Sequence, residues 1–147
     1  MQGLKIKKLN EKAVLPCRAT PGSAGLDLYA CLSSPVVIAP GERELIPTGI
    51  AIDLPNSGVV GLVYARSGLA IKKGITLSNC VGVIDSDYKG ELKIGLINTS
   101  KEPYTLENGD RIAQLVIAPI LCPEPFWVEE LEVSERGEDG FGSTGRK

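Results

Sequence analysis

The amino-acid sequence predicts an all-β sandwich or barrel. Short apolar and β-branched runs recur along the chain, and Gly, Pro, Asn or Asp separates them. Short strands at such close spacing are typical of two packed sheets or a closed barrel. Only the stretch 66–73, RSGLAIKK, indicates a helix, and that helix is short. The 147 residues suit one domain, which is large enough to bury a hydrophobic core without disulfides or metals.

The expected strands follow one another along the chain. Residues 4–7 alternate apolar and polar side chains, which predicts an edge strand. Further strands are expected at 25–29, 36–38, 44–54 (interrupted at Pro47 and Gly49), 59–64, 104–106, 112–117 and 126–133. In the stretch 79–98, two apolar runs flank the polar turn 86–90, a pattern that predicts a β-hairpin.

The end of the chain has a different composition. Residues 135–147, ERGEDGFGSTGRK, are rich in glycine and charge, and Phe141 is their only large apolar side chain. Such a segment cannot bury enough apolar surface to order itself. We therefore expect an all-β core at 1–134 and a flexible glycine-rich segment at 135–147. That segment is either a disordered tail or a lid that closes on a ligand through Phe141.

Composition excludes several classes of partner. The formal net charge is −2, so no electrostatic argument favours nucleic acid or an anionic membrane as the main partner. There is no long apolar run and no apolar signal region at the N-terminus, so we expect a soluble, cytoplasmic protein.

Cysteine and histidine usage restricts the chemistry. The chain has no histidine, and Cys17, Cys31, Cys80 and Cys122 form no CxxC pair. A zinc site is therefore disfavoured, and we expect buried free thiols. Without histidine, catalysis must depend on carboxylates, Lys, Tyr, Ser or a hard metal ion.

Several segments carry side chains suited to chemistry, although each is weak evidence alone. Arg66, Ser67 and Gly68 follow an expected strand and offer a guanidinium, a hydroxyl and an accessible backbone to phosphate oxygens. A structural turn would have the same sequence. Asp27, taken by itself, fits a solvated strand residue, and Asp85 and Asp87 fit a solvated acidic turn.

The combination of segments is far more specific. AGLDLYA (24–30), ARSGLA (65–70), GVIDSDYKGEL (82–92), GDRIAQL (109–115) and RGEDGFGSTG (136–145) occur in this order. Together they resemble the five motifs of the trimeric dUTP diphosphatases (dUTPases) over essentially the whole chain. The resemblance implies a jelly-roll-like, β-clip subunit and a homotrimer whose active sites are shared between subunits. It also implies Mg²⁺-dependent cleavage of dUTP to dUMP and diphosphate, which limits uracil in DNA and supplies dUMP for thymidylate synthesis.

The same resemblance implies roles for individual residues. Asp85 is expected to activate the attacking water, and Asp27 and Gln114 are expected to hold Mg²⁺ through metal-bound waters. Tyr88 is expected to pack under the deoxyribose and exclude a 2′-hydroxyl. The remaining substrate-binding residues are expected to be Arg66, Ser67, Gly68 and Gln114 near the phosphates, Asn79, Gly82, Val83 and Ile84 along the uracil, and Arg136, Phe141, Gly142, Ser143 and Thr144 in the lid. Asp139 departs from the family's usual glycine, and it either weakens lid docking slightly or points to solvent.

Two rival functions were weighed. The zinc-free dCTP deaminases that resemble this fold have a catalytic Glu three residues before the Asn that ends the hairpin, where this chain has Gly95. Zinc-dependent deamination lacks its His and Cys ligands. The second rival is a non-catalytic trimeric binding or signalling protein. Such a protein would show a decayed site, whereas Arg66, Tyr88 and Phe141 are present. Diphosphate release from dUTP with Mg²⁺ discriminates between these functions.

Overall fold

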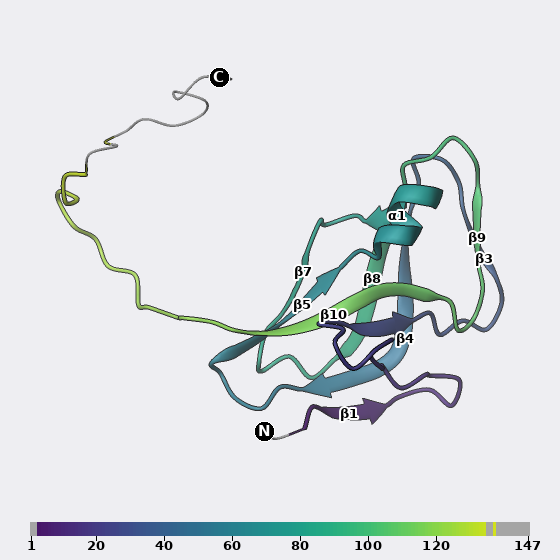
Figure 1. The fold of residues 1–147 in the computed structure, drawn as a ribbon, viewed down its shortest axis with the longest axis horizontal. Coiled ribbons are helices and arrows are strands. Elements are labelled where there is room, and N and C mark those ends of the chain that lie inside the picture. The colour runs from purple at the N-terminus through teal and green to yellow at the C-terminus, as the bar shows by residue number, and fades with distance from the viewer. Residues whose placement is uncertain (1–2, 135–136, 138–147) are drawn as a thin grey trace.

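The strands form two antiparallel four-stranded sheets and one two-stranded ribbon in the computed structural model, which describes residues 3–134 and 137 (Figure 1). The first sheet has the order β1 (Lys5–Lys8), β4 (Arg43–Asp53), β8 (Glu91–Asn98) and β6 (Ile75–Leu77). The second sheet has the order β2 (Leu26–Tyr29), β10 (Arg111–Pro119), β5 (Val59–Tyr64) and β7 (Gly82–Ile84), and the ribbon pairs β3 (Val36–Ile38) with β9 (Tyr104–Leu106). The predicted all-β class is confirmed.

The hydrophobic core draws on strands from both four-stranded sheets. Along β8 every second residue is buried, from Leu92 through Ile94 and Leu96, so one face of this strand points inward. Leu28 and Leu115, which lie on the other sheet, are fully buried in the same cluster. Burying side chains of this size contributes about 1.5–3 kcal/mol each.

The one helix, α1 (Ser67–Lys73), lies where the sequence predicted it. It ends at Gly74, which adopts a left-handed φ of 68° and donates its N–H to the Ala70 carbonyl oxygen. Glycine is favoured in this conformation because it has no Cβ to clash with the carbonyl. At its other end, the helix begins immediately after Arg66, two residues beyond the end of β5.

The stretch 79–98 does not form the predicted hairpin. Strand β7 pairs with β5 in one sheet, whereas β8 pairs with β4 and β6 in the other. The two strands are consecutive in sequence but separate into different layers, so the turn between them crosses from one sheet to the other. The sequence pattern also missed β6, which occupies the edge beside β8.

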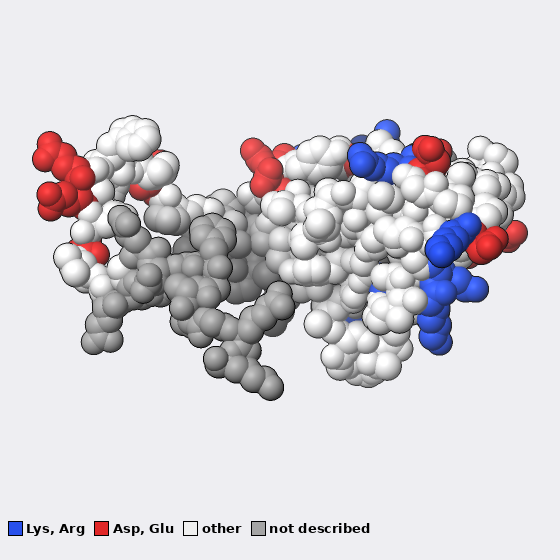
Figure 2. Space-filling view, turned by 90° about the horizontal axis from the view of Figure 1, so that it is seen from above, with Lys and Arg blue, Asp and Glu red and all other residues white. Residues whose placement is uncertain are grey.

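The strand predicted at 126–133 is not formed. Residues 120–134 have no helix or strand, and Figure 1 shows them running away from the sheets. Their large apolar side chains are exposed, including Leu121, Phe126, Trp127, Leu131 and Val133. Acidic side chains of this segment stand apart from the Lys and Arg of the sheets in Figure 2. Within the described residues the segment pairs with no strand, so its β-forming composition does not produce one there.

The burial of the cysteines and the length of the helix also bear on the sequence analysis. All four cysteines are free, but only Cys31 is buried. The expectation of buried thiols is wrong for Cys17, Cys80 and Cys122, which are exposed. Among residues 3–134 and 137, no helix has the length and apolar character needed to cross a lipid bilayer.

Candidate active site

Strand pairing brings three of the sequence motifs together. Gln114 on β10 lies opposite Asp27 on β2 and, on its other side, opposite Tyr64 on β5. Tyr64 directly precedes Ala65 and Arg66. Segments that are far apart along the chain therefore meet on three adjacent strands, and this register places the candidate metal-binding and phosphate-binding residues side by side.

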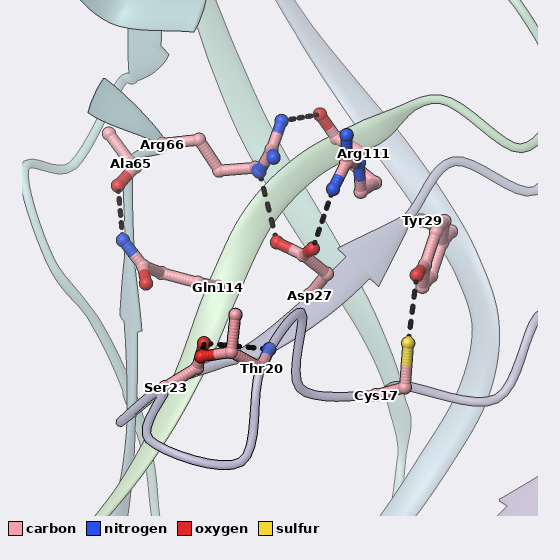
Figure 3. A network of polar contacts seen from close by, with 9 residues as sticks. All are labelled: Cys17, Thr20, Ser23, Asp27, Tyr29, Ala65, Arg66, Arg111 and Gln114. Carbon is pink, nitrogen blue, oxygen red and sulfur yellow. Dashed lines mark hydrogen bonds and ion pairs between the residues drawn. The ribbon is translucent and has the colours of Figure 1, made fainter. Parts of the chain in front are cut away.

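Asp27 is held by two guanidinium groups (Figure 3). Its Oδ1 accepts a hydrogen bond from Arg66 Nε at 3.0 Å, and its Oδ2 accepts one from Arg111 Nη1 at 3.2 Å. The Asp27 side chain is only 12% exposed. A carboxylate with so little access to water needs such charged partners, because its lost hydration is otherwise uncompensated. Asp27 is thus no solvated strand residue.

The orientation of Gln114 is also defined. Its Nε2 donates a hydrogen bond to the Ala65 carbonyl oxygen at 3.0 Å, which turns the Gln114 amide oxygen away from Ala65. A Cβ built on Gly25 would lie 2.7 Å from Gln114 Oε1. Glycine at position 25 therefore leaves room for this oxygen. Asp27 and Gln114 present one carboxylate and one amide oxygen, which are ligands that suit Mg²⁺ and its waters.

These residues line one pocket of about 380 Å³. Its walls include Asp27, Arg66, Ser67, Gly68 and Gln114, so the structure brings together the five residues of the predicted core, 1–134, that were expected to bind metal and phosphates. Positive charge exceeds negative charge in this lining, since it contains Arg66, Lys72 and Lys73 but only the carboxylate of Asp27. The pocket can accept a polyanion accompanied by a cation.

Sequence reasoning missed several residues of this pocket. Lys72 and Lys73 end α1, and Ser23 and Tyr104 come from loop 16–24 and from β9. Burial raises the pKa of the Tyr104 hydroxyl above its ordinary value, and the nearby Asp110 carboxylate adds to the effect. The basic pair at the end of the predicted helix was a usable signal for the lysines. Nothing in the sequence placed Tyr104 here, because its position follows from the pairing of β3 with β9.

A second, smaller pocket of about 120 Å³ lies where β7 and β8 separate. Four residues predicted to bind uracil line it, namely Asn79, Gly82, Val83 and Ile84. Gly95 on β8 lines it as well, and a Cβ built there would lie 2.5 Å from Ser78 Oγ. A side chain at position 95, where the resembling deaminases have their Glu, would therefore have to displace Ser78.

The turn after β7 holds Asp85 and Tyr88. The Tyr88 N–H donates to the Asp85 carbonyl oxygen at 3.2 Å, and the Tyr88 hydroxyl donates to the Glu91 carbonyl oxygen at 2.9 Å. A Cβ built on Gly90 would lie 2.7 Å from Tyr88 Cζ, so the ring packs directly over Gly90. The Asp85 side chain is exposed and lines neither pocket.

The predicted site residues thus separate into two groups within this chain. One group surrounds Asp27 and the other surrounds β7, and none of the residues that the structure describes lines both pockets. Arg136, Phe141, Gly142, Ser143 and Thr144, as well as Asp139, lie outside the described residues.

Comparisons with known proteins identify the family. A family model described as dUTPase matches residues 11–145. A deoxyuridine 5′-triphosphate nucleotidohydrolase of Coxiella burnetii is 54% identical over 140 residues, covering 95% of this chain and 92% of the relative. The protein of the same name from Desulfitobacterium hafniense is 48% identical over 149 residues, covering 99% of each chain.

Solved structures show the same similarity. The dUTPase of Staphylococcus bacteriophage 80alpha with dUPNHPP has a TM-score of 0.86 and 36% identity, covering 99% of both chains. A variant dUTPase from phage phi11 of S. aureus, which coordinates a structural Mg(II) ion, has a TM-score of 0.81 and 32% identity, covering 90% of this chain and 100% of that one. The family model spans most of the sequence, and both relatives are well above 30% identity. The chain belongs to the dUTPase family.

Proposed function

We propose that the protein hydrolyses dUTP to dUMP and diphosphate, with Mg²⁺ as cofactor and with Asp85 activating the attacking water. The observation that best supports this is the shared pocket of Asp27, Gln114 and Arg66. A carboxylate and an amide oxygen there lie beside a guanidinium that can bind phosphate oxygens. The relatives named above act on deoxyuridine triphosphate, and the bacteriophage 80alpha dUTPase was solved with dUPNHPP.

The phosphates are proposed to lie against Arg66, Ser67 and Gly68. The guanidinium and the hydroxyl donate to phosphate oxygens. A Cβ built on Gly68 would meet no atom within 4 Å, so open space lies beside this backbone and a phosphate can approach it. Lys72 and Lys73 add positive charge to the same wall. This side of the pocket would bind the triphosphate electrostatically.

The pocket residues also fit Mg²⁺. Asp27 and Gln114 would hold it through its waters, because Mg²⁺ keeps several waters when substrate phosphates supply its other ligands. When bound, the ion would neutralise phosphate oxygens and orient the triphosphate. Asp27 already accepts hydrogen bonds from two guanidinium groups, and the Gln114 amide oxygen is directed away from Ala65.

The uracil is proposed to enter the pocket between β7 and β8. Backbone groups along 81–83 and the Asn79 amide would pair with the uracil edge, and a pocket of about 120 Å³ leaves little space for a 5-methyl group. Cytosine would leave buried polar groups unpaired, which is costly. Tyr88 packs over Gly90 in the turn between β7 and β8. Its ring would support the deoxyribose there and exclude a 2′-hydroxyl.

Asp85 is proposed as the group that accepts the proton of the attacking water. It directly follows β7, next to the proposed uracil pocket, and would lie on the sugar side of the nucleotide. In a chain without histidine, a carboxylate is the available general base. A carboxylate suffices because the metal ion and Arg66 carry the charge that develops on the phosphoryl group.

We further propose a homotrimer whose active sites are shared between subunits. The two groups of site residues do not meet in one pocket of a single chain, so a partner subunit would bring them together. The segment 120–134 also exposes Phe126, Trp127 and Leu131. Apolar side chains exposed together mark a surface that another chain covers. A second copy of this chain is the proposed partner.

Four further parts of the proposal rest on the sequence, through its composition or through the family resemblance. The segment 135–147 would act as a lid, with Arg136, Ser143 and Thr144 on the phosphates and Phe141 stacked on the uracil. It would form a unit distinct from the core at 1–134. The metabolic role would be to limit uracil in DNA and to supply dUMP, and a cytoplasmic location stays a prediction.

One experiment tests the function directly. Diphosphate release is measured with dUTP, dTTP, dCTP and UTP, each with Mg²⁺ and with EDTA, and the native mass is measured by sedimentation. Of the four nucleotides, we expect only dUTP to release diphosphate rapidly with Mg²⁺, and we expect EDTA to abolish that release. We expect the native mass to equal that of three chains. No release from dUTP with Mg²⁺ would contradict the function, and ammonia release from dCTP would support the deaminase rival.

A further inference from the structure

Arg111 stands in an unusual position on β10. Relative to β2, β10 contains one extra residue, since Arg111 lies opposite Tyr29 and Ala113 lies opposite Leu28. In a regular strand, residues three apart face opposite sides of the sheet. The extra residue instead allows both Arg111 and Gln114 to lie beside Asp27 (Figure 3). A bulge of this kind redirects a side chain and is frequent next to active sites.

The two arginines that hold Asp27 have different surroundings. Arg66 lines the 380 Å³ pocket, whereas Arg111 does not. The Arg111 side chain is 49% exposed and approaches Asp27 from outside the pocket. Each arginine takes a different carboxylate oxygen, so the two do not compete for one atom.

We propose that Arg111 is a positioning residue that keeps Asp27 paired while Arg66 binds phosphate. Because this role rests on the proposed function, it concerns the same site and the same polyanionic substrate. An incoming phosphate competes with Asp27 for the Arg66 guanidinium. If Arg66 were the only partner of Asp27, its movement toward phosphate would leave a poorly hydrated carboxylate unpaired. Arg111 removes this penalty by holding Oδ2 throughout.

The proposal predicts that Arg111 acts through Asp27 and only weakly on the phosphate itself. Loss of Arg111 should therefore weaken phosphate binding when Asp27 is present. When Asp27 is replaced, loss of Arg111 should change the affinity for phosphate only slightly. A residue that contributed only a long-range positive charge would weaken binding equally in both cases. A residue with a merely structural role would change the unfolding temperature without this dependence on Asp27.

The experiment is a double-mutant cycle on the full-length protein. Binding of tripolyphosphate in EDTA is measured by calorimetry for the wild type, Arg111→Gln, Asp27→Asn and the double variant. The readout needs neither metal nor turnover. Thermal unfolding of each unliganded variant establishes that it is folded at the assay temperature. Arg43→Gln is the matched control, because Arg43 is an exposed strand arginine on the other sheet.

We expect Arg111→Gln to weaken tripolyphosphate binding by about tenfold, and by less than about twofold in the Asp27→Asn variant. Arg111→Lys, which keeps the charge, should recover most of the binding, and Arg43→Gln should bind as the wild type does. Equal weakening in both backgrounds, or unchanged binding in Arg111→Gln, would overturn the proposal. Failure of the proposed function has a different signature, since wild-type protein would then bind tripolyphosphate without releasing diphosphate from dUTP.

Discussion

Asp27 and Gln114 lie directly opposite each other on adjacent antiparallel strands. This pairing aligns a buried carboxylate with an amide oxygen, and Arg66, at the start of α1 just after β5, reaches Asp27 from the other side of β10. The proposed metal-binding residues therefore lie on paired strands of one sheet, and the proposed phosphate-binding residues follow the adjacent strand. Side chains held on strands keep their geometry better than side chains on loops.

The first prediction concerns the metal. Asp27→Asn should raise the Mg²⁺ concentration needed for half-maximal diphosphate release by about tenfold or more. The reason is that an amide oxygen accepts a weaker hydrogen bond from a metal-bound water than a carboxylate does. Mg²⁺ titration of the turnover rate measures this. Asp53→Asn is the matched control, since Asp53 pairs with Lys89 and Lys5 on the surface. An unchanged Mg²⁺ response in Asp27→Asn would remove Asp27 from the metal site.

The second prediction concerns the general base. Asp85→Asn should lower turnover by about 10²-fold or more while nucleotide binding stays near normal, as expected when a positioned base is lost. Turnover is measured with dUTP, and binding is measured with a non-hydrolysable analogue. Asp87→Asn changes an exposed carboxylate of the same turn and should leave turnover nearly unaffected. Near-normal turnover of Asp85→Asn would exclude Asp85 from the mechanism.

The third prediction concerns sugar selection. A Cβ at Gly90 would lie 2.5 Å from the Tyr88 hydroxyl oxygen, so Gly90→Ala must displace the Tyr88 ring. The ratio of kcat/KM for dUTP to that for UTP should therefore fall. Tyr88→Phe keeps the ring and loses only the hydrogen bond to the Glu91 carbonyl oxygen, so it should preserve the ratio better. If Gly90→Ala discriminates as well as the parent, Tyr88 does not exclude the 2′-hydroxyl.

The fourth prediction concerns the proposed lid. Truncation before Arg136 should leave a folded trimer with little turnover, because stacking of Phe141 on the uracil and water exclusion from the phosphates are lost. Refolding the truncated chain together with the Asp85→Asn chain should restore some activity, since a shared site can then combine an intact Asp85 with an intact lid. Full turnover of the truncated protein would show that the segment is a tail without a role in catalysis.

The fifth prediction concerns pH. Burial raises the pKa of Tyr104 above 10.0, so the folded protein holds this proton more tightly than the unfolded chain does. The resulting stability is present below pH 10 and is lost as the pH rises through the folded-state pKa. Tyr104→Phe cannot ionise and should lose less unfolding free energy between about pH 9 and about pH 11. Denaturant unfolding at several pH values measures this, and equal alkaline losses in both proteins would contradict it.

Local sequence patterns predicted much of this molecule. Apolar runs predicted strands within the stretch 79–98, and RSGLAIKK predicted the position of α1. These features depend on neighbours within a few positions along the chain, which is the range that a sequence pattern describes. The family resemblance, and not a local pattern, identified Asp27, Arg66, Ser67, Gly68 and Gln114 of the pocket, whereas Ser23, Lys72, Lys73 and Tyr104 were missed.

The sequence by itself therefore determined the all-β class, the helix and the chemical character of the candidate site. Only the tertiary structure decided that β7 and β8 belong to different sheets and that residues 120–134 pair with no strand of the described part of the chain. It alone revealed the extra residue in β10 and the contacts of Asp27 with Arg66 and Arg111, which lie 39 and 84 positions away. The physical reason is that a strand's alternation specifies which of its faces is buried, whereas its partner is chosen by packing between distant segments.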